Sequence, residues 1–425
     1  MKLESYWLDT APPFAAGAQG PVEGRADVVV IGAGFTGLSA ALTLTRRGAS
    51  VVVLEAGRVV GEASGRNGGH CNNGLPHDFG ALVDRFGAQQ ARAFYQAYGA
   101  AVDAVEQIVR EEAIDCHFQR RGRLKLAAKP GHYDKLAKTY EVLHDNVDPQ
   151  VQLVPADRIR EEVGSGAFYG GLIQVTSAQM HMGQFGVGLA QAAARRGASI
   201  YESATVTGLE RLSGGSHRVT CARGVIEARQ VLLATGVTQV GPFGWFRRRM
   251  APVGSFIIVT EPLDVAVLDR LLPKRRCYVT SKNIGNYFRV TPDNRLLFGG
   301  RARFAMSNPR SDQKSGHVLR STLGQLFPEL SRVRVDYCWG GLVDMTADRL
   351  PRAGEHEGLF YSMGYSGHGV QMSVRMGQIM TDVLDGRAAA NPWRELDWPP
   401  IPGHFGKPWF LPFVGAYYRL QDILY

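Results

Sequence analysis

Asp27-Val-Val-Val-Ile31-Gly32-Ala33-Gly34-Phe35-Thr36-Gly37 is the stretch that decides the fold. An apolar run of β-branched residues predicts a buried strand, and the glycine pattern follows it at once. The Ala/Leu-rich stretch 38–47 then predicts a helix that ends at Gly48. A second apolar run, 50–54, ends at Glu55. The sequence therefore predicts a complete β-α-β unit.

The three glycines of this pattern have separate roles in a dinucleotide site. Gly32 permits the tight turn out of the strand, Gly34 lets the backbone approach a pyrophosphate, and Gly37 allows close packing of helix and strand. Glu55 stands 18 residues after Gly37, where an acidic side chain accepts the ribose hydroxyls. Because a carboxylate repels a 2′-phosphate, this position argues against NADP.

Two further segments favour FAD over NAD. Ala63–Gly69 is a glycine-rich loop with one cation, and Leu232–Gly236 predicts a strand that returns to the same domain. Gly364–Gly369 precedes a predicted helix that runs to about Asp385. The free N–H groups at that helix start would stabilise a reduced, anionic flavin, whereas nicotinamide develops no such anion.

Composition and charge limit the classes of protein. With 425 residues, 45% hydrophobic and 20% charged, the chain is an ordinary folded protein of roughly two or three structural units. The net charge of +9 resides in residues 241–310, which hold 13 Lys/Arg against 4 Asp/Glu. Nucleic acid, an acidic membrane surface and an anionic small molecule are all compatible partners.

Cysteine spacing and the N-terminal sequence indicate the cellular compartment that we expect for the protein. The five cysteines show no paired spacing, so we expect neither a disulfide framework nor a metal site. Residues 1–25 lack the apolar region of a secretory signal and are expected to form a surface lead-in. No apolar run reaches the roughly 18 residues of a membrane span. A reducing, cytoplasmic setting is expected.

These motifs together resemble one enzyme family along nearly the whole chain. The motifs are Ser5–Trp7, Ser64–Gly69, Tyr287–Gly300, Trp339-Gly340, Gly364–Val370 and Ala416–Tyr418. The chain resembles the D-amino-acid oxidase/glycine oxidase (DAO) family of FAD-dependent enzymes, nearest its γ-glutamylputrescine oxidase and bacterial L-pipecolate oxidase branches. The resemblance implies a glutathione-reductase-like FAD fold of mixed α/β and α+β class. A discontinuous Rossmann-type FAD-binding domain would carry an antiparallel β-sheet substrate domain.

The expected domains are built from separate segments. Residues 1–80, 150–240 and 336–390 would form the FAD-binding domain, and residues 81–149 and 241–335 the substrate-binding domain. Residues 391–425 would be a C-terminal segment that packs on the body.

The resemblance also implies which residues bind FAD. The implied set is Gly32, Gly34, Phe35, Thr36, Gly37, Glu55, Ala56, Ser64, Arg66, Asn67, Gly68, Gly69, Val206, Thr235, Gly236, Trp339, Gly340, Asp344, Gly364, Tyr365, Ser366, Gly367, His368, Gly369 and Val370. Val206 would act through its backbone amide beside the adenine.

The chain departs from the family pattern at two positions. Gly341 stands where sarcosine oxidases carry a flavin-linking cysteine, and Cys338 lies three residues earlier, so noncovalent FAD is expected. Gln371 follows Val370 where those relatives carry a lysine, which puts that lysine's role in doubt.

The implied reaction is oxidation of a C–N bond by hydride transfer to flavin N5, with O2 or another acceptor reoxidising the flavin. The substrate would be a carboxylate-bearing amine such as γ-glutamylputrescine, or a cyclic imino acid such as L-pipecolate. The candidate catalytic residues are His368, Tyr287, Arg289 and His181. Arg289 is either a carboxylate clamp or a solvated surface residue. His181 is either a pocket base or hydrogen-bond donor, or a packed core histidine. His368 is interpreted as a loop residue near the flavin that acts through geometry, in preference to a general base.

Two other hypotheses use the aromatic and basic stretches. Trp245–Arg249 pairs aromatic with cationic side chains, as an RNA-modifying flavoprotein would, although a solvated turn explains it better. Trp409–Tyr418 would suit a membrane-peripheral dehydrogenase that donates to quinone, or a segment packed on its own chain. No nucleic-acid partner is expected, and the basic charge is interpreted as serving an anionic substrate.

Overall fold

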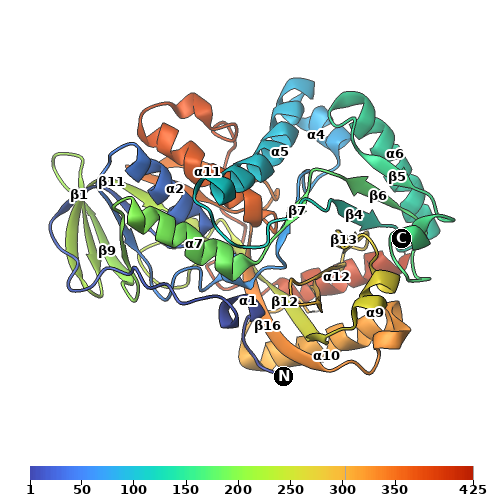
Figure 1. Ribbon diagram of the computed structural model, residues 1–425. Coiled ribbons are helices and arrows are strands. Elements are labelled where there is room, and N and C mark those ends of the chain that lie inside the picture. Colours follow the sequence, from blue (N-terminus) through green and yellow to red (C-terminus); the bar gives the residue numbers. More distant parts are fainter. Residues whose placement is uncertain (302, 425) are drawn as a thin grey trace.

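The computed structural model describes residues 1–301 and 303–424, which form two eight-stranded β-sheets and a two-stranded sheet of β3 and β7, with helices packed around them (Figure 1). Ala302 and Tyr425, which belong to the expected ranges 241–335 and 391–425, lie outside the described residues.

The first sheet carries the predicted β-α-β unit. Its strand order is β17-β18-β11-β1-β2-β8, and a hairpin of β9 and β10 continues from β11. The strands are β1 (Arg25–Ile31), β2 (Val51–Leu54), β8 (Ser199–Tyr201), β9 (Val206–Arg211), β10 (His217–Cys221), β11 (Gly224–Leu233), β17 (Arg352–His356) and β18 (Leu359–Met363). β1 pairs in parallel with both β2 and β11. This parallel β-α-β core, with its long helices on one face, is typical of a dinucleotide-binding domain.

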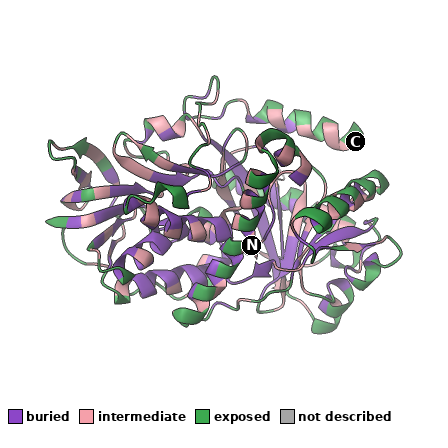
Figure 2. Cartoon of the chain, turned by 90° about the horizontal axis from the view of Figure 1, so that it is seen from above, coloured by how far each residue is buried: buried purple, intermediate pink, exposed green. Residues whose placement is uncertain are grey.

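Helices pack on one face of this sheet because that face of its central strands is apolar. They are α2 (Phe35–Arg46), α5 (Ala88–Glu111), α7 (Met182–Arg195) and α11 (Gly369–Leu384). α2 packs against both α7 and α11, and α11 also packs against α5. The core strands are buried, and the outer helix faces are exposed (Figure 2).

The second large sheet also has eight strands and is mostly antiparallel. Its order is β16-β12-β15-β14-β13-β4-β6-β5, and only the β13–β4 pair is parallel. The strands are β4 (Arg123–Leu126), β5 (Gln152–Val154), β6 (Gly171–Gln174), β12 (Ala251–Pro262), β13 (Cys277–Thr280), β14 (Asn286–Val290), β15 (Arg295–Gly300) and β16 (Val335–Met345).

The remaining elements cover or connect the two sheets. α10 packs on β12 and β16, and α6 packs on β5 and β6. These elements are α1 (Tyr6–Asp9), α3 (Ala63–Arg66), β3 (His70–Cys71), α4 (Phe79–Phe86), α6 (Pro130–Asn146), the 3₁₀ turn Ile159–Glu161, β7 (Ala178–Gln179), α8 (Gly244–Arg247), α9 (Val265–Leu271), α10 (Pro309–Leu326), the 3₁₀ turns Pro328–Leu330 and Ala388–Ala390, and α12 (Leu411–Leu424).

The strand pairing differs from the expected domain division in two places. β5 and β6 fall inside the 150–240 range that was assigned to the FAD-binding domain, yet they pair with each other, and β6 pairs with β4, in the second sheet. β16 opens the 336–390 range, yet it runs antiparallel to β12 in the same sheet. A local sequence pattern indicates that a strand forms, but its partner is set by contacts distant in sequence.

The N-terminal lead-in also differs from expectation. Tyr6 and Trp7 of α1 are buried, not solvated. The Ser5 hydroxyl donates to Gly65 O at 2.6 Å, and Trp7 Nε1 donates to Asn67 O at 2.7 Å. The N-terminal segment therefore packs against the loop 63–69 and holds its backbone in place.

Candidate active site

The glycine turn after β1 has the geometry that its three glycines predict. Gly32 has φ +106°, and a Cβ there would lie 2.7 Å from Ala234 O at the end of β11. A Cβ on Gly34 would reach the Ser64 hydroxyl at 3.0 Å, and one on Gly37 would collide with Gly32 O. The turn brings the backbone of β1, α2 and β11 close together. It leaves the first amides of α2 without intrahelical acceptors, as an anion site requires.

Glu55 lies at the end of β2 beside this turn. Its carboxylate accepts from Ala33 N and Gly57 N, both at 2.8 Å. Burial raises the pKa of Glu55, and the two backbone N–H groups oppose that rise. Ala56 is exposed next to it, and Val206 is buried at the start of β9. The carboxylate is thus oriented where the sequence places a ribose acceptor.

The loop 63–69 joins the glycine turn to the second sheet. Its first half forms α3, and the Ser64 hydroxyl accepts from Phe35 N at 3.0 Å. Arg66 is locked onto β16, because its Nε donates to Gly340 O and its carbonyl accepts from Trp339 Nε1, both at 2.9 Å. Asn67 Oδ1 accepts from Gly69 N at 2.9 Å. The hydrogen bonds that join Arg66 to Trp339 and Gly340 of β16 therefore fix the path of the loop.

The second glycine loop, 364–369, lies next to the first. The Tyr365 hydroxyl is 2.8 Å from Thr36 Oγ1 of α2 and 2.9 Å from Ser362 Oγ. Asp344 Oδ2 accepts from Gly364 N at 2.7 Å. Burial raises the Asp344 pKa to about 6, although several backbone N–H groups hold it down. A Cβ on Gly236 would lie 3.8 Å from the same carboxylate, so the ends of β11 and β16 meet here.

These observations fit a dinucleotide with a flavin end. The glycine turn leaves room for a pyrophosphate, the Glu55 carboxylate can accept ribose hydroxyls, and the start of α11 can face a flavin. Ser366 and Gly367 have φ values of +52° and +92°, which turn the chain sharply into α11. Such a turn leaves amide groups available at the helix start.

Tyr287 lies on the face of the second sheet that is turned toward the loop 63–69. Its hydroxyl is 3.1 Å from Ser255 Oγ, and its ring makes an edge contact with His70 at 5.4 Å between centroids. A Cβ on Gly68 would lie 2.6 Å from the Tyr287 ring, and one on Gly299 would collide with it. Glycines on both sides thus make room for this ring. Burial raises the Tyr287 pKa to about 12, so the phenol is neutral.

His368 caps α11 and faces Tyr98. The two rings lie 6.0 Å apart between centroids. Among the described residues, neither His368 Nδ1 nor the Tyr98 hydroxyl has a hydrogen-bond partner, and both atoms are buried. Burial lowers the His368 pKa to about 3, and the charges of Arg123, Arg349 and Arg301 lower it further. A neutral imidazole with a free nitrogen therefore stands at the start of α11.

Arg289 is not a solvated surface residue, and its position does not support a carboxylate clamp. It is 2% exposed, and its Nη1 donates to Gly69 O at 2.7 Å and Met180 O at 2.8 Å. Its guanidinium also lies 5.5 Å from the Trp7 ring. Burial lowers its pKa to about 10, so the charge is retained. The Arg289 guanidinium is thus hydrogen-bonded to backbone carbonyls, and through Gly69 it anchors the end of the loop 63–69.

His181 has the role of a helix cap. Its Nδ1 accepts from Gln184 N at 3.2 Å as the N-cap of α7, and its Nε2 is 2.9 Å from Thr10 Oγ1. Since both nitrogens are engaged, we withdraw the pocket-base hypothesis for this residue. The packed-histidine alternative describes the observed contacts.

Sequence reasoning missed several polar residues near Tyr287 and His368. His70 and Asn72 have buried side-chain atoms without partners among the described residues, and so do Tyr98 and Arg123. The available signal was the alternation in Arg123-Leu-Lys-Leu126, which gives β4 one apolar and one cationic face. Such a face is ordinarily exposed to solvent, and only the fold turns it inward.

The aromatic and basic stretch 245–249 is packed and is not a solvated turn. The Trp245 ring stacks on His356 at 3.8 Å between centroids, and the Arg249 guanidinium lies 3.6 Å from the Trp245 centroid. Arg249 and Arg247 donate to nearby backbone carbonyls. These contacts give the stretch a structural role.

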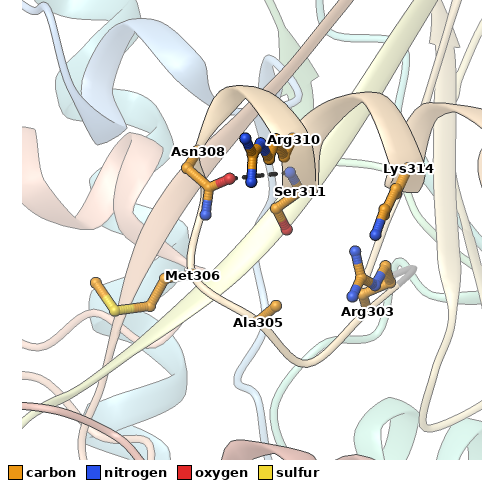
Figure 3. A pocket seen from close by; sticks show the side chains of 7 residues that line it. All are labelled: Arg303, Ala305, Met306, Asn308, Arg310, Ser311 and Lys314. Carbon is orange, nitrogen blue, oxygen red and sulfur yellow. Dashed lines mark hydrogen bonds between the residues drawn. The ribbon is translucent and has the colours of Figure 1, made fainter.

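Part of the basic segment 241–310 lines a shallow surface pocket at the start of α10. Arg303, Arg310 and Lys314 surround it, together with Ser311 and Asn308 (Figure 3). Asn308 caps the helix by accepting from Ser311 N at 3.0 Å. The basic residues of this segment therefore lie at several separate places, some packed on aromatic rings and some lining the pocket.

Comparison with known proteins gives matches along most of the chain. Residues 27–383 match the DAO model, described as FAD dependent oxidoreductase. The chain is 32% identical to γ-glutamylputrescine oxidoreductase of Escherichia coli over 410 residues, which is 94% of this chain and 93% of that protein. It is also 32% identical to the probable oxidoreductase OrdL of Haemophilus influenzae, covering 85% and 83% of the two chains.

Solved structures share the fold. Glycine oxidase from Geobacillus kaustophilus aligns with a TM-score of 0.70 at 22% identity, covering 90% of this chain and 98% of that one. L-amino acid deaminase from Proteus vulgaris aligns with a TM-score of 0.72 at 18% identity, covering 90% and 98%. Within residues 1–301 and 303–424, no helix has the length and apolar character needed to cross a membrane.

Proposed function

The chain belongs to the DAO family of FAD-dependent oxidoreductases, and from that premise we propose that it oxidises the C–N bond of a carboxylate-bearing amine to an imine. The two candidate substrates are γ-glutamylputrescine, on which the E. coli relative is named to act, and a cyclic imino acid such as L-pipecolate. When bound, FAD supplies the hydride acceptor at flavin N5, and O2 or another acceptor then takes the electrons.

The residues that would hold FAD come from four segments. The glycine turn and the start of α2 would bind the pyrophosphate, and Glu55 would accept the ribose hydroxyls. The loop 63–69 and the start of α11 would enclose the flavin end. Arg66 and Asp344 would act by fixing the two glycine loops, because both bond to backbone groups of the neighbouring segment.

Noncovalent binding of FAD is supported by the direction of the Cys338 thiol, which is the cysteine nearest in sequence to position 341. Cys338 Sγ donates to Asp312 O at 3.2 Å, on the α10 side of the second sheet. Trp339, the next residue of β16, bonds to the loop 63–69 on the opposite side. Acid precipitation of the yellow protein should release all flavin into the supernatant. Flavin that stays in the pellet after denaturation would contradict noncovalent attachment.

The observation that carries the proposal is the neutral His368 at the start of α11, on which the charges of Arg123, Arg301 and Arg349 act. Hydride loss from a C–N bond requires the neutral amine, and a positive field lowers the pKa of an amine. The His368 imidazole is uncharged and therefore adds no positive charge of its own, and Tyr98 and Tyr287 help to exclude water. The chain thus supplies orientation, a dry surrounding and deprotonation of the substrate.

A substrate panel with oxygen as the acceptor tests the proposal. γ-Glutamylputrescine, L-pipecolate, proline, sarcosine and free polyamines should be compared by H2O2 release from the purified enzyme. At least one carboxylate-bearing amine should give saturable turnover. Turnover only of uncharged or polycationic amines would refute the substrate class.

A membrane-peripheral dehydrogenase remains the second candidate because of one observation. The C-terminal region exposes large apolar side chains, and most are three or four residues apart along α12. They are Phe405 at 84%, Trp409 at 65%, Phe413 at 70%, Tyr417 at 57%, Leu420 at 55%, Ile423 at 76% and Leu424 at 65% exposure. Flotation with anionic vesicles, together with reduction of a soluble quinone in place of O2, would favour this candidate.

The cytoplasm is our proposed location. All five cysteines are buried and free, as is usual in a reducing compartment. Fractionation of the native host checks this, since recovery in the periplasmic fraction would contradict it.

A further inference from the structure

Two cations on β4 share a sheet face with Tyr287. In the strand register Tyr287 lies opposite Val279, and Val279 lies beside Lys125. Arg123 is two residues before Lys125, so both side chains leave the same face of the sheet. Adjacent strands are about 4.8 Å apart, which puts Lys125 roughly 10 Å from Tyr287 along that face. Both cations therefore lie within a small substrate's length of the candidate site.

Neither cation has an acidic partner among the described residues. Arg123 donates to the neutral amide oxygen of Gln174, and its buried Nε has no partner there. Burial lowers the pKa of both Arg123 and Lys125, and the charge of Arg123 lowers the pKa of Lys125 further. Lys125 is nevertheless reached by solvent. Two neighbouring cations that form no ion pair repel each other, and a bound anion offsets that repulsion.

Carboxylates in the vicinity are already used by other groups. Asp148 accepts from the Tyr95 hydroxyl at 2.7 Å, and Asp348 is paired with Arg352 at 2.8 Å. Asp78 caps α4 through Ala81 N at 3.2 Å; its charge acts on Lys125, but the two side chains form no ion pair within 4.0 Å. The protein therefore leaves Arg123 and Lys125 available for a ligand.

The opposite side of this region is also positive or neutral. The charges of Arg301 and Arg349 act on His368, whose Nδ1 is free among the described residues. His70, beside Tyr287, is neutral because burial lowers its pKa to about 3. A protonated polyamine tail would meet repulsion here, whereas a second carboxylate would meet attraction.

We propose that Arg123 and Lys125 form the anion subsite of the substrate, and that the preferred substrate is an acidic amine with more than one carboxylate. This inference rests on the proposed amine oxidation and narrows its substrate class. It places the carboxylate contact on β4, whereas Arg289 serves the loop 63–69. It also disfavours γ-glutamylputrescine, which carries one carboxylate and a cationic tail.

Anion binding tests the subsite without turnover. Calorimetric titration of the purified holoenzyme with glutarate and with its monoamide, glutaramate, compares two ligands of nearly equal shape that differ by one charge. Glutarate should bind at least about tenfold more tightly, since a hydrogen bond between charged groups contributes about that factor or more. Arg123→Gln and Lys125→Gln should each lower the affinity for glutarate about tenfold and leave the affinity for glutaramate nearly unchanged.

The matched control is Lys274→Gln, which removes one positive charge at an exposed site between α9 and β13, outside the proposed subsite. It should leave glutarate affinity within about twofold, the range of screened surface charge. The proposed subsite would be contradicted if glutarate and glutaramate bound with equal affinity. It would also be contradicted if Lys274→Gln lost as much glutarate affinity as Arg123→Gln and Lys125→Gln. Such a result would leave amine oxidation standing. Absence of turnover with intact glutarate selectivity would instead refute the proposed function alone.

Discussion

At the scale of single residues, Glu55 is the clearest test of the cofactor site. Glu55→Lys removes the acceptor of Ala33 N and Gly57 N and brings a cation to the ribose position. The purified variant should contain at least about tenfold less flavin, as expected when a principal ligand contact is lost. Flavin content follows from absorbance near 450 nm. Glu62→Lys, at an exposed neighbouring position, should keep full flavin content.

Arg289 should behave as a structural anchor. Arg289→Met orphans the buried carbonyls of Gly69 and Met180, which costs on the order of 3 kcal/mol of unfolding free energy. Urea unfolding should show this loss, and the exposed Arg92→Met should not. KM should rise by a similar factor for neutral and carboxylate-bearing amines. A rise confined to carboxylate substrates would restore the clamp role.

The buried Asp344 carboxyl should make the stability difference between the wild type and Asp344→Asn depend on pH. Burial raises its pKa from 3.8 to about 6, so ionisation opposes folding. Its favourable contribution is complete below pH 3.8 and is lost as the pH rises through about 6. The melting temperature of Asp344→Asn relative to the wild type should therefore increase between pH 4 and pH 7. A constant difference over that range would show that Asp344 is ionised throughout.

At the scale of elements, one hydroxyl joins the start of α2 to the loop before α11. Tyr365→Phe removes the bonds to Thr36 and Ser362 and should cost about 1–2 kcal/mol of stability. Titration of the apoprotein with FAD should also show weaker binding, because the two glycine loops lose their connection. Tyr361→Phe is the matched control, since no described residue bonds to its hydroxyl. Unchanged FAD affinity in Tyr365→Phe would argue against the connection.

The predictable elements were those whose sequence requirement is local. The turn after β1 needs Gly32 at φ +106° and Gly37 against a carbonyl, so the glycine pattern indicated it directly. The partners of β5 and β6 were not predictable, because pairing with β4 depends on distant contacts. Alternation correctly placed Tyr287 and Arg289 on one face, but it could not show that backbone carbonyls would occupy Arg289.

At the scale of the whole molecule, the excess of basic residues has several uses. Arg289 anchors the loop 63–69, and Arg249 packs on Trp245. Arg303 and Arg310 line a surface pocket beside α10. The cations nearest the candidate site include Arg123 and Lys125, which lie outside residues 241–310. The net charge led us to expect an anionic substrate, but the two cations of the proposed subsite lie outside the segment that holds the excess.

Anaerobic flavin bleaching is the most direct test of amine oxidation by this chain. The holoenzyme, mixed without oxygen with each carboxylate-bearing amine of the panel, should lose its absorbance near 450 nm with at least one of them. The rate should saturate with amine concentration and rise with pH as the amine loses its proton. Flavin that stays oxidised with every amine, in protein that dithionite still reduces, would contradict the account.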